Sequence, residues 1–292
     1  MSRPHLAHAA LTLSLTALTT LSACGGEENN ASDAPVETST RISVEGYSLV
    51  RTARFSPDGT RLVMFAEKDA DTTHMITTNL EGGDVKVHVT EGLGYLSSAA
   101  WFPDGEQLAY TGDGGLHRIG LEEGAEPKKI VEAFAAFGVD VSPDGSEVTW
   151  TINGQQKVNK ATVGEEPIQT FEATYGPEGS VPRFSPDGST VFFMAGGGFE
   201  TPSKFYTIAA TLEGDPEEVA EGGDYLSNGA WIDDNTVLVI IGDGISKLDL
   251  TTRETTQIED AFAAMEIDVS ADGTKYIYGI NGQRSLILDD LE

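Results

Sequence analysis

Residues 55–59 read Phe-Ser-Pro-Asp-Gly, and this short turn sequence returns along the rest of the chain. Three further copies begin at Phe102, Val141 and Phe184, and two altered copies begin at Ile232 and Ser270. Successive copies lie about 38 to 47 residues apart, which is the length of a four-stranded propeller blade. Helical repeats would need apolar residues at spacings of three and four, a pattern that the chain lacks. The six turns therefore predict an all-β, six-bladed propeller.

A longer repeat relates the two halves of the chain. The first half contains EAFAAFGVDVSPDG and then TINGQ (132–155), and the second contains DAFAAMEIDVSADG and then GINGQ (260–283). Likewise, YLSSAAW (95–101) returns as YLSNGAW (225–231). Because each half contains three turns, we infer that an ancestor of three blades was duplicated once.

The residue types of the turn explain its recurrence without any catalytic role. Proline presets the backbone angle of the first central position, and aspartate can accept hydrogen bonds from the backbone that follows it. Glycine accepts the positive φ that closes the hairpin. We therefore interpret the repeated aspartates as structural.

Residues 41–292 are expected to form one propeller domain of four-stranded blades. The sixth unit contains only three predicted strands, and residues 41–47 resemble a fourth strand that lacks its own first three. We expect 41–47 to pair with the last blade and close the ring, which would remove two open sheet edges. Residues 67–74 and 196–204 differ between the halves, and we expect them, including Gly196 to Gly198, to form long loops.

The beginning of the chain has the pattern of a targeting segment. A short basic start leads to an apolar stretch, and Leu21-Ser22-Ala23-Cys24 matches the bacterial lipobox. We predict a signal peptide at 1–23, lipidation of Cys24 and an acidic disordered tether at 24–40. An ordinary secretory signal with a chance cysteine is the alternative. Cys24 is the single cysteine, which excludes an intramolecular disulfide.

The expected location follows from this segment. The chain should reside in the bacterial cell envelope and contact the membrane only through its lipid. Gly25 stands where an aspartate would favour the inner membrane of Gram-negative bacteria, so we expect outer-membrane sorting in such a host.

Acidic residues dominate the composition, with 47 Asp and Glu against 18 Lys and Arg and a formal net charge of −29. Such a surface repels phosphate backbones and anionic lipid headgroups, which argues against nucleic-acid binding. Solubility alone could explain this charge, but a basic partner or divalent cations would also suit it.

Few residues in the chain suggest catalysis. The predicted mature chain has three histidines, His74, His88 and His117, and it lacks the nucleophile-elbow and zinc-binding motifs of hydrolases. Asp140 and Asp268 lie on the predicted innermost strands of units three and six and could face the channel. They are candidate ligands for calcium, which prefers oxygen donors. The simpler interpretation is a pair of solvated carboxylates, and we expect no cofactor.

Aromatic residues recur in the links that lead from one blade to the next. The six aromatic positions are Tyr47, Tyr95, Phe134, Tyr175, Tyr225 and Phe262. If they ring one face, they are candidates for partner recognition, although packing between blades would also explain them. The acidic candidates on the same face are Glu67, Asp69, Asp71 and Glu200. An aromatic ring with an acidic rim would favour a cationic or peptide-like ligand.

With its repeated turns, blade-length spacing and lipoprotein signal, the chain resembles the WD40-like propeller repeats of the TolB type over residues 41–292. The resemblance implies a six-bladed propeller, here expected without the additional N-terminal domain of TolB itself. The repeat occurs in periplasmic scaffolds and in gating domains of peptidases, so it implies little about function.

These observations predict a monomeric, lipid-anchored propeller that binds an envelope protein or peptide without catalysis. A calcium-dependent hydrolase or lactonase with its site in the channel is the alternative. A purely structural envelope component is a third possibility.

Overall fold

The chain divides into two units, Met1–Glu37 and Thr38–Glu292, and all the features below belong to the second. The computed structural model describes residues 39–69, 72–95, 97–152, 158–164, 169–171, 181–198, 201–222 and 229–292. Throughout these ranges the regular structure is β-strand, and no helix long and apolar enough to cross a membrane is found there.

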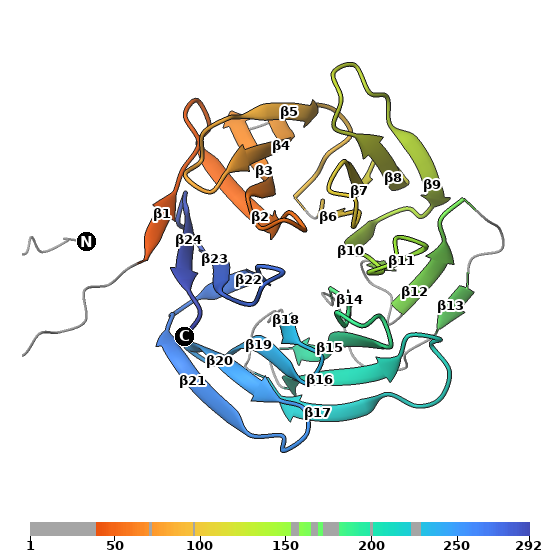
Figure 1. Ribbon diagram of the computed structural model, residues 1–292, viewed down its shortest axis with the longest axis vertical. Helices are drawn as coiled ribbons and strands as arrows, with labels where there is room; N and C mark the ends of the chain where they lie inside the picture. The colour runs from red at the N-terminus through yellow and green to blue at the C-terminus, as the bar shows by residue number, and fades with distance from the viewer. Residues whose placement is uncertain are drawn as a thin grey trace, which may run out of the picture. The chain divides into compact units, whose positions relative to one another are not determined.

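Six antiparallel sheets of four strands each surround a central axis, which confirms the predicted six-bladed propeller (Figure 1). The first strand of each sheet lies nearest the axis and the following strands lie progressively further out. The order within the last sheet is β22, β23, β24 and β1, so the first strand of the chain is its outermost member.

The first three blades have the following strands. Blade 1 contains β2 (Leu49–Phe55), β3 (Arg61–Asp69), β4 (Thr72–Asn79) and β5 (Lys86–Val89). Blade 2 contains β6 (Ala99–Trp101), β7 (Gln107–Gly112), β8 (Gly115–Gly120) and β9 (Lys128–Glu132). Blade 3 contains β10 (Ala136–Val141), β11 (Glu147–Ile152), β12 (Val158–Thr162) and β13 (Gln169–Phe171).

The second half of the chain supplies the other three. Blade 4 contains β14 (Arg183–Phe184), β15 (Thr190–Gly198), β16 (Thr201–Ala209) and β17 (Glu217–Glu221). Blade 5 contains β18 (Gly229–Asp233), β19 (Thr236–Ile241), β20 (Gly244–Asp249) and β21 (Thr255–Asp260). Blade 6 contains β22 (Ala264–Val269), β23 (Lys275–Ile280), β24 (Leu286–Asp290) and β1 (Thr40–Ile42).

The ring closes where β1 pairs antiparallel with β24, with Thr40 opposite Leu288 and Ile42 opposite Leu286. The predicted closure is therefore confirmed, but the closing strand is shorter than the expected residues 41–47. Beyond Ile42 the chain must turn inward to begin β2, and a turn forms in which the Tyr47 amide donates to the Val44 carbonyl at 3.2 Å. Gly46 supplies the positive φ of 82° within this bend.

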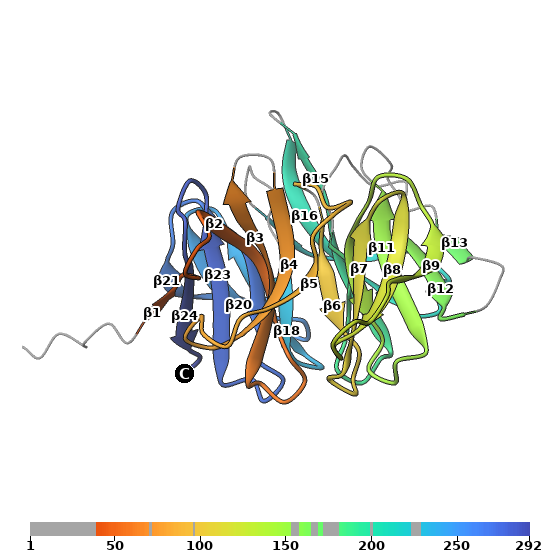
Figure 2. The same ribbon diagram turned by 90° about the horizontal axis from the view of Figure 1, so that it is seen from above.

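The prediction of long loops at 67–74 and 196–204 is wrong, because the described residues of both segments belong to hairpins. Glu67 pairs with Thr73 in the β3–β4 hairpin, and Gly196 pairs with Ser203 in the β15–β16 hairpin. Each strand of these two hairpins has eight or nine residues, because the backbone ladder continues past the ends of the inner strands. Figure 2 shows β15 and β16 extending beyond the rest of one face.

Apolar side chains between neighbouring blades form the core. Six hydrophobic clusters are found among the described residues, each lying between two adjacent sheets. Alternation along β3 shows how one strand serves two interfaces. Leu62 and Met64 pack toward blade 6, whereas Val63 and Phe65 pack toward blade 2, and all four are fully buried.

The repeated turn is held by a set of side-chain hydrogen bonds that the third copy illustrates. The Ser142 hydroxyl donates to Asp144 Oδ1 at 2.7 Å and accepts from the Glu147 amide at 2.9 Å. Asp144 Oδ1 also accepts from the Ser146 amide at 2.9 Å, and Gly145 has a φ of 74°. The structural interpretation of these aspartates is confirmed, since their carboxylates bond within the turn.

These bonds favour the charged carboxylates. The pKa of Asp58, Asp144 and Asp272 is lowered to about 2. The largest cause is the hydrogen bond from the serine two residues before each aspartate, and the next is the hydrogen bonds from the residue two positions after it. The same causes lower the pKa of Asp187. The deprotonated form of these turn aspartates is thus the stable form at neutral pH.

The closure can be tested at Ile42, which is fully buried between blades 6 and 1. We expect Ile42→Ala to lower the free energy of unfolding of the whole domain by about 2–5 kcal/mol, the usual cost of truncating a buried isoleucine. The neighbouring Arg41 is exposed, and Arg41→Ala serves as the matched control. Thermal and chemical unfolding would measure both, and equal stabilities of the two variants would contradict closure by β1.

The turn bonds predict a pH-dependent difference between the wild type and Ser142→Ala. Because the folded pKa of Asp144 is depressed to about 2, its stabilising contribution is complete above the ordinary pKa near 4 and is lost as the pH falls through 2. Denaturant unfolding at several pH values should therefore show the largest stability gap at neutral pH and a narrowing gap from about pH 4 to pH 2. A gap of constant size would contradict this assignment.

Candidate functional site

Four charged side chains meet at the inner strands, three of them buried and Arg54 partly buried. Arg54 on β2 contacts Asp140 on β10 at 2.7 Å and Asp268 on β22 at 3.0 Å, and Arg183 on β14 contacts Asp268 at 3.3 Å. This channel network joins blades 1, 3, 4 and 6, and it lines a cavity of about 350 Å³ that opens among the repeated turns.

The second carboxylate oxygen of each aspartate bonds to the backbone of the next blade. Asp140 Oδ2 accepts from the Phe184 amide and Asp268 Oδ2 accepts from the Phe55 amide, both at 2.9 Å. Two tryptophans make a corresponding pair of links, at 3.1 Å each. Trp101 Nε1 donates to the Arg54 carbonyl, and Trp231 Nε1 donates to the Arg183 carbonyl. The channel network thus follows the two-fold repetition of the chain.

The surroundings of Asp140 and Asp268 do not suit a divalent cation. Both residues face the channel, and burial raises the pKa of each carboxyl while the Arg54 guanidinium acts in the opposite direction. Guanidinium groups already contact both carboxylates. A metal cation would therefore have to displace a guanidinium group or lie close to its positive charge. Across the described residues, no group of three or more His, Cys, Asp and Glu side chains has the geometry to hold a metal ion.

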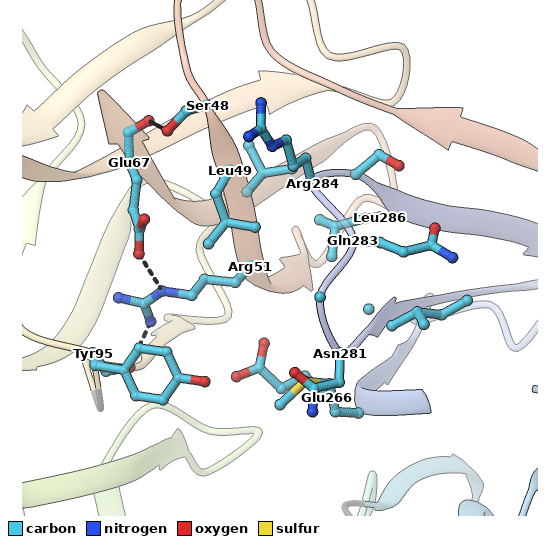
Figure 3. Close-up of a pocket in the computed structure, with 16 residues that line it drawn as sticks. Ser48, Leu49, Arg51, Glu67, Tyr95, Glu266, Asn281, Gln283, Arg284 and Leu286 are labelled. Carbon is cyan, nitrogen blue, oxygen red and sulfur yellow. Dashed lines mark hydrogen bonds and ion pairs between the residues drawn. The ribbon is translucent and has the colours of Figure 1, made fainter. Parts of the chain in front are cut away.

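A separate pocket of about 410 Å³ lies between blades 6 and 1, on the face opposite the repeated turns (Figure 3). It is bounded by the start of β2, the far end of β3, the bulge of β22 and the turn between β23 and β24. This blade 6–1 pocket has charged, amide, aromatic and aliphatic side chains in its wall, a mixture typical of ligand sites.

Arg51 is the central cation of this pocket. Its guanidinium donates to the carbonyls of Tyr95 at 2.7 Å and Gly94 at 3.0 Å, and its Nε lies 3.7 Å from Glu67 Oε1. The guanidinium carbon also lies 5.0 Å from the centre of the Tyr95 ring, a cation–π contact. Arg51 therefore fixes the link between blades 1 and 2 at the pocket wall, as Figure 3 shows.

Glu266 is the partly buried carboxylate of the pocket. It accepts from the Thr52 amide at 2.6 Å and from the Thr52 hydroxyl at 2.9 Å. Both residues lie at bulges of their strands and have positive φ, 55° for Glu266 and 56° for Thr52. Burial raises the pKa of Glu266, with the Thr52 bonds and the charge of Arg51 acting in the opposite direction.

Three of the six predicted aromatic residues are strongly exposed. Relative exposure reaches 68% for Tyr95, 87% for Phe134 and 75% for Phe262. Tyr47 instead packs against the blade 6–1 core, and its hydroxyl lies 3.0 Å from His74 Nδ1. Tyr175 and Tyr225 lie outside the described residues, so the predicted ring is represented by three surface aromatics.

Phe134 and Phe262 occupy equivalent strained turns in the two halves of the chain. The Ala136 amide donates to the Ala133 carbonyl at 3.2 Å, and the Ala264 amide donates to the Ala261 carbonyl at 3.0 Å. Ala135 and Ala263, which follow the phenylalanines, have φ values of 59° and 60°. Left-handed alanines are disfavoured by about 1–2 kcal/mol each, so the backbone holds these exposed rings at an energetic cost.

The predicted acidic rim is only partly described. Glu67 is half-buried in the pocket and faces Arg51, whereas Asp69 is exposed at the end of β3. Asp71, Glu200 and the predicted lipidation site Cys24 lie outside the described residues.

Sequence reasoning missed Arg51 and Glu266. A comparison of the two halves could have found them, because the repeat aligns Glu266 with Gly138 and Arg51 with Ser180.

The histidines lie on separate strands. His74 on β4 contacts Tyr47, His88 on β5 lies 2.9 Å from the Thr77 hydroxyl, and His117 on β8 stacks on Tyr110. Burial lowers the pKa of His88 and of His117. These contacts within blade 1 and within blade 2 do not bring the three histidines together into a common proton-transfer site.

Comparison with known proteins supports the architecture. The chain matches TolB from Acinetobacter baumannii with a TM-score of 0.53 and 13% identity, over 83% of this chain and 54% of that one. The chain shares its propeller fold with TolB. A chain of a nidogen/laminin complex matches with a TM-score of 0.63 and 16% identity, over 80% and 90% of the two chains. An oligogalacturonate lyase in complex with manganese matches with a TM-score of 0.56 and 17% identity, over 83% and 74%.

Sequence comparison gives a partial relative. No protein-family model matches the chain. Over 146 residues it is 28% identical to the uncharacterized peptidase YuxL of Bacillus subtilis (strain 168), which covers 49% of this chain and 21% of the relative. The chain thus spans about a fifth of the length of that relative and about half of the Acinetobacter TolB chain.

The channel network predicts a specific pattern of stability changes. Arg54→Met removes the cation that bridges Asp140 and Asp268, and loss of one partner from a buried pair typically costs about 3–5 kcal/mol. Arg253→Met, which breaks an exposed ion pair with Glu217, should cost less than about 1 kcal/mol. Millimolar calcium should leave the wild-type melting temperature unchanged. A calcium-dependent rise would instead support a cation site at these carboxylates.

Proposed function

We propose that this propeller is a non-enzymatic binding module whose partner, a protein or peptide, docks on the face opposite the repeated turns. The observation that carries this proposal is the exposure of Tyr95, Phe134 and Phe262 in the links between blades. Large aromatic side chains supply much of the binding energy at protein interfaces.

The two phenylalanine turns support the proposal further. Each half of the chain keeps its exposed phenylalanine and the left-handed alanine that follows it. Folding gains nothing from an exposed ring on a strained turn, so binding gives a reason for both features. The rigid blades beneath would hold these rings in place before the partner arrives, which reduces the entropy lost on binding.

The proposed location is the bacterial cell envelope, with the lipid on Cys24 as the membrane anchor. The lipobox ending at Cys24 and the TolB-like fold are the observations in favour. Retention of the protein in the membrane fraction, and its release in a Cys24→Ser variant, would test the anchor.

A calcium-dependent hydrolase is the less favoured function. The names of the lyase and peptidase matches leave an enzyme possible, but the carboxylates of the channel are engaged by arginines and bond to the neighbouring blades. A calcium site in the channel would have to break these contacts, whereas a binding surface on the opposite face leaves them intact. We therefore favour the binding function.

The proposal is tested by removing the three surface aromatics together. We expect a Tyr95→Ala, Phe134→Ala, Phe262→Ala variant to lose at least about 90% of its crosslinked partner in envelope preparations, since single interface hot spots each contribute about 2 kcal/mol or more. Its melting temperature should stay within a few degrees of the wild type, because all three side chains are exposed.

A matched control removes exposed apolar side chains elsewhere. Val87 on β5 and Ile258 on β21 are also exposed, and both lie on outermost strands. The Val87→Ala, Ile258→Ala variant should capture its partner as the wild type does. Equal crosslinking yields from the aromatic variant, the control variant and the wild type would exclude the proposed face.

A further inference from the structure

The duplication provides an internal comparison for the blade 6–1 pocket. The junction between blades 3 and 4 is its counterpart, and the repeat aligns Arg51 with Ser180, Glu67 with Gly196, and Glu266 with Gly138. Over the same stretch, the channel residues Arg54 and Asp140 are matched by Arg183 and Asp268. The fold therefore keeps its channel charges at both junctions but has the three pocket charges at one only. Joining two blades does not require them.

Glu266 is unfavourable for the backbone that it occupies. Gly138 takes the corresponding bulge with a φ of 67°, whereas Glu266 adopts 55° with a side chain attached. Glycine adopts this region freely and glutamate does so only at a cost, so the second half has a strained residue where the first half has a suitable one. The glutamate also places a carboxylate in a partly buried position, and this burial raises its pKa.

The charge of Glu266 is not matched by a close cation. Thr52 supplies its two hydrogen bonds, and no ion pair within 4.0 Å is found for it among the described residues. Arg51 is turned toward Glu67 and the carbonyls of Gly94 and Tyr95. Arg51 is itself more than nine-tenths buried, and its Nε has no hydrogen-bond acceptor among the residues that the structure describes.

The pocket can accommodate a long basic side chain. Its volume is about 410 Å³, and Leu49, Met265 and the exposed Tyr95 ring supply apolar wall. Methylene groups of a lysine or arginine pack well on such surfaces while the charged end reaches a carboxylate. Arg284 lies at the exposed rim of the pocket, on the turn between β23 and β24 (Figure 3).

We propose that the blade 6–1 pocket binds the ammonium or guanidinium group of a basic side chain, with Glu266 as its counter-charge. Arg51 Nε would donate to a backbone carbonyl oxygen of the bound basic residue. The Tyr95 ring would pack against the methylene groups of that residue. This inference rests on the proposed binding function, because it names the group of the partner that this face recognises. It also explains why a strained, partly buried glutamate stands where the other half has glycine.

The test measures binding of two small probes to the whole propeller by ligand-observed NMR at physiological ionic strength. One probe is Nα-acetyl-lysine N-methylamide, and the other is the same molecule with its Nε acetylated, which removes the positive charge. We expect the charged probe to bind and the acetylated probe not to bind. Glu266→Gln should weaken binding of the charged probe by about tenfold or more, as expected for a hydrogen bond to a charged group.

Two further variants complete the test. Glu126→Gln removes an equal charge from an exposed position between β8 and β9, and should leave probe binding within about twofold of the wild type, because salt screens a distant surface charge. Glu266→Gly, which introduces the residue of the other half, should melt at or above the wild-type temperature and lose the probe.

Two results would overturn the proposal. The first is undiminished probe binding by Glu266→Gln. The second is a melting temperature of Glu266→Gly far below the wild type, which would mean that the carboxylate serves mainly to hold Thr52. Probe binding that depends on Glu266, without any captured partner, would support the pocket while refuting the protein-binding function.

Discussion

Arg54 connects opposite sides of the ring because its guanidinium bridges two aspartates, while Arg183 supplies the second positive charge. A propeller blade contacts only its two neighbours through its apolar faces, so those contacts alone cannot relate blade 1 to blade 3. The channel network does so directly, since the Arg54 guanidinium contacts Asp140 and Asp268 and each of these carboxylates also bonds to the backbone of a following blade. The inner strands are thereby fixed with respect to one another, and the positions of all the surface links depend on them.

Much of this architecture could be predicted from the sequence because its determinants are local. The turn needs only a serine, an aspartate and a glycine in order, and the structure shows those residues bonding to one another. Closure by the first strand followed from a missing strand in the last unit. The long hairpins were mistaken for loops because residues such as Gly196 to Gly198 carry no strand pattern. Pairing across the hairpin, which depends on the facing strand, determines their conformation.

The candidate site was less predictable, because its residues come together from distant parts of the chain. Arg51 and Glu266 are far apart in sequence, and both have counterparts of different chemistry in the other half. The position of Tyr47 was also unpredictable from its spacing, since the segment that leads into blade 1 packs on the blade 6–1 core. A duplicated chain thus separates two kinds of residue. The channel charges are retained at both junctions, whereas Arg51 and Glu266 occur at one only and are therefore not required for joining two blades.

The β1–β24 pairing has a mechanical consequence. Within the described residues, three backbone pairs join β1 to β24. Tension applied to the chain before Thr40 would reach these pairs before any other part of the ring. The antiparallel pairing would resist a pull along the strands, by shearing all its bonds together, far better than a pull across them, which breaks one bond at a time. The direction of a load would thus decide whether the propeller stays closed.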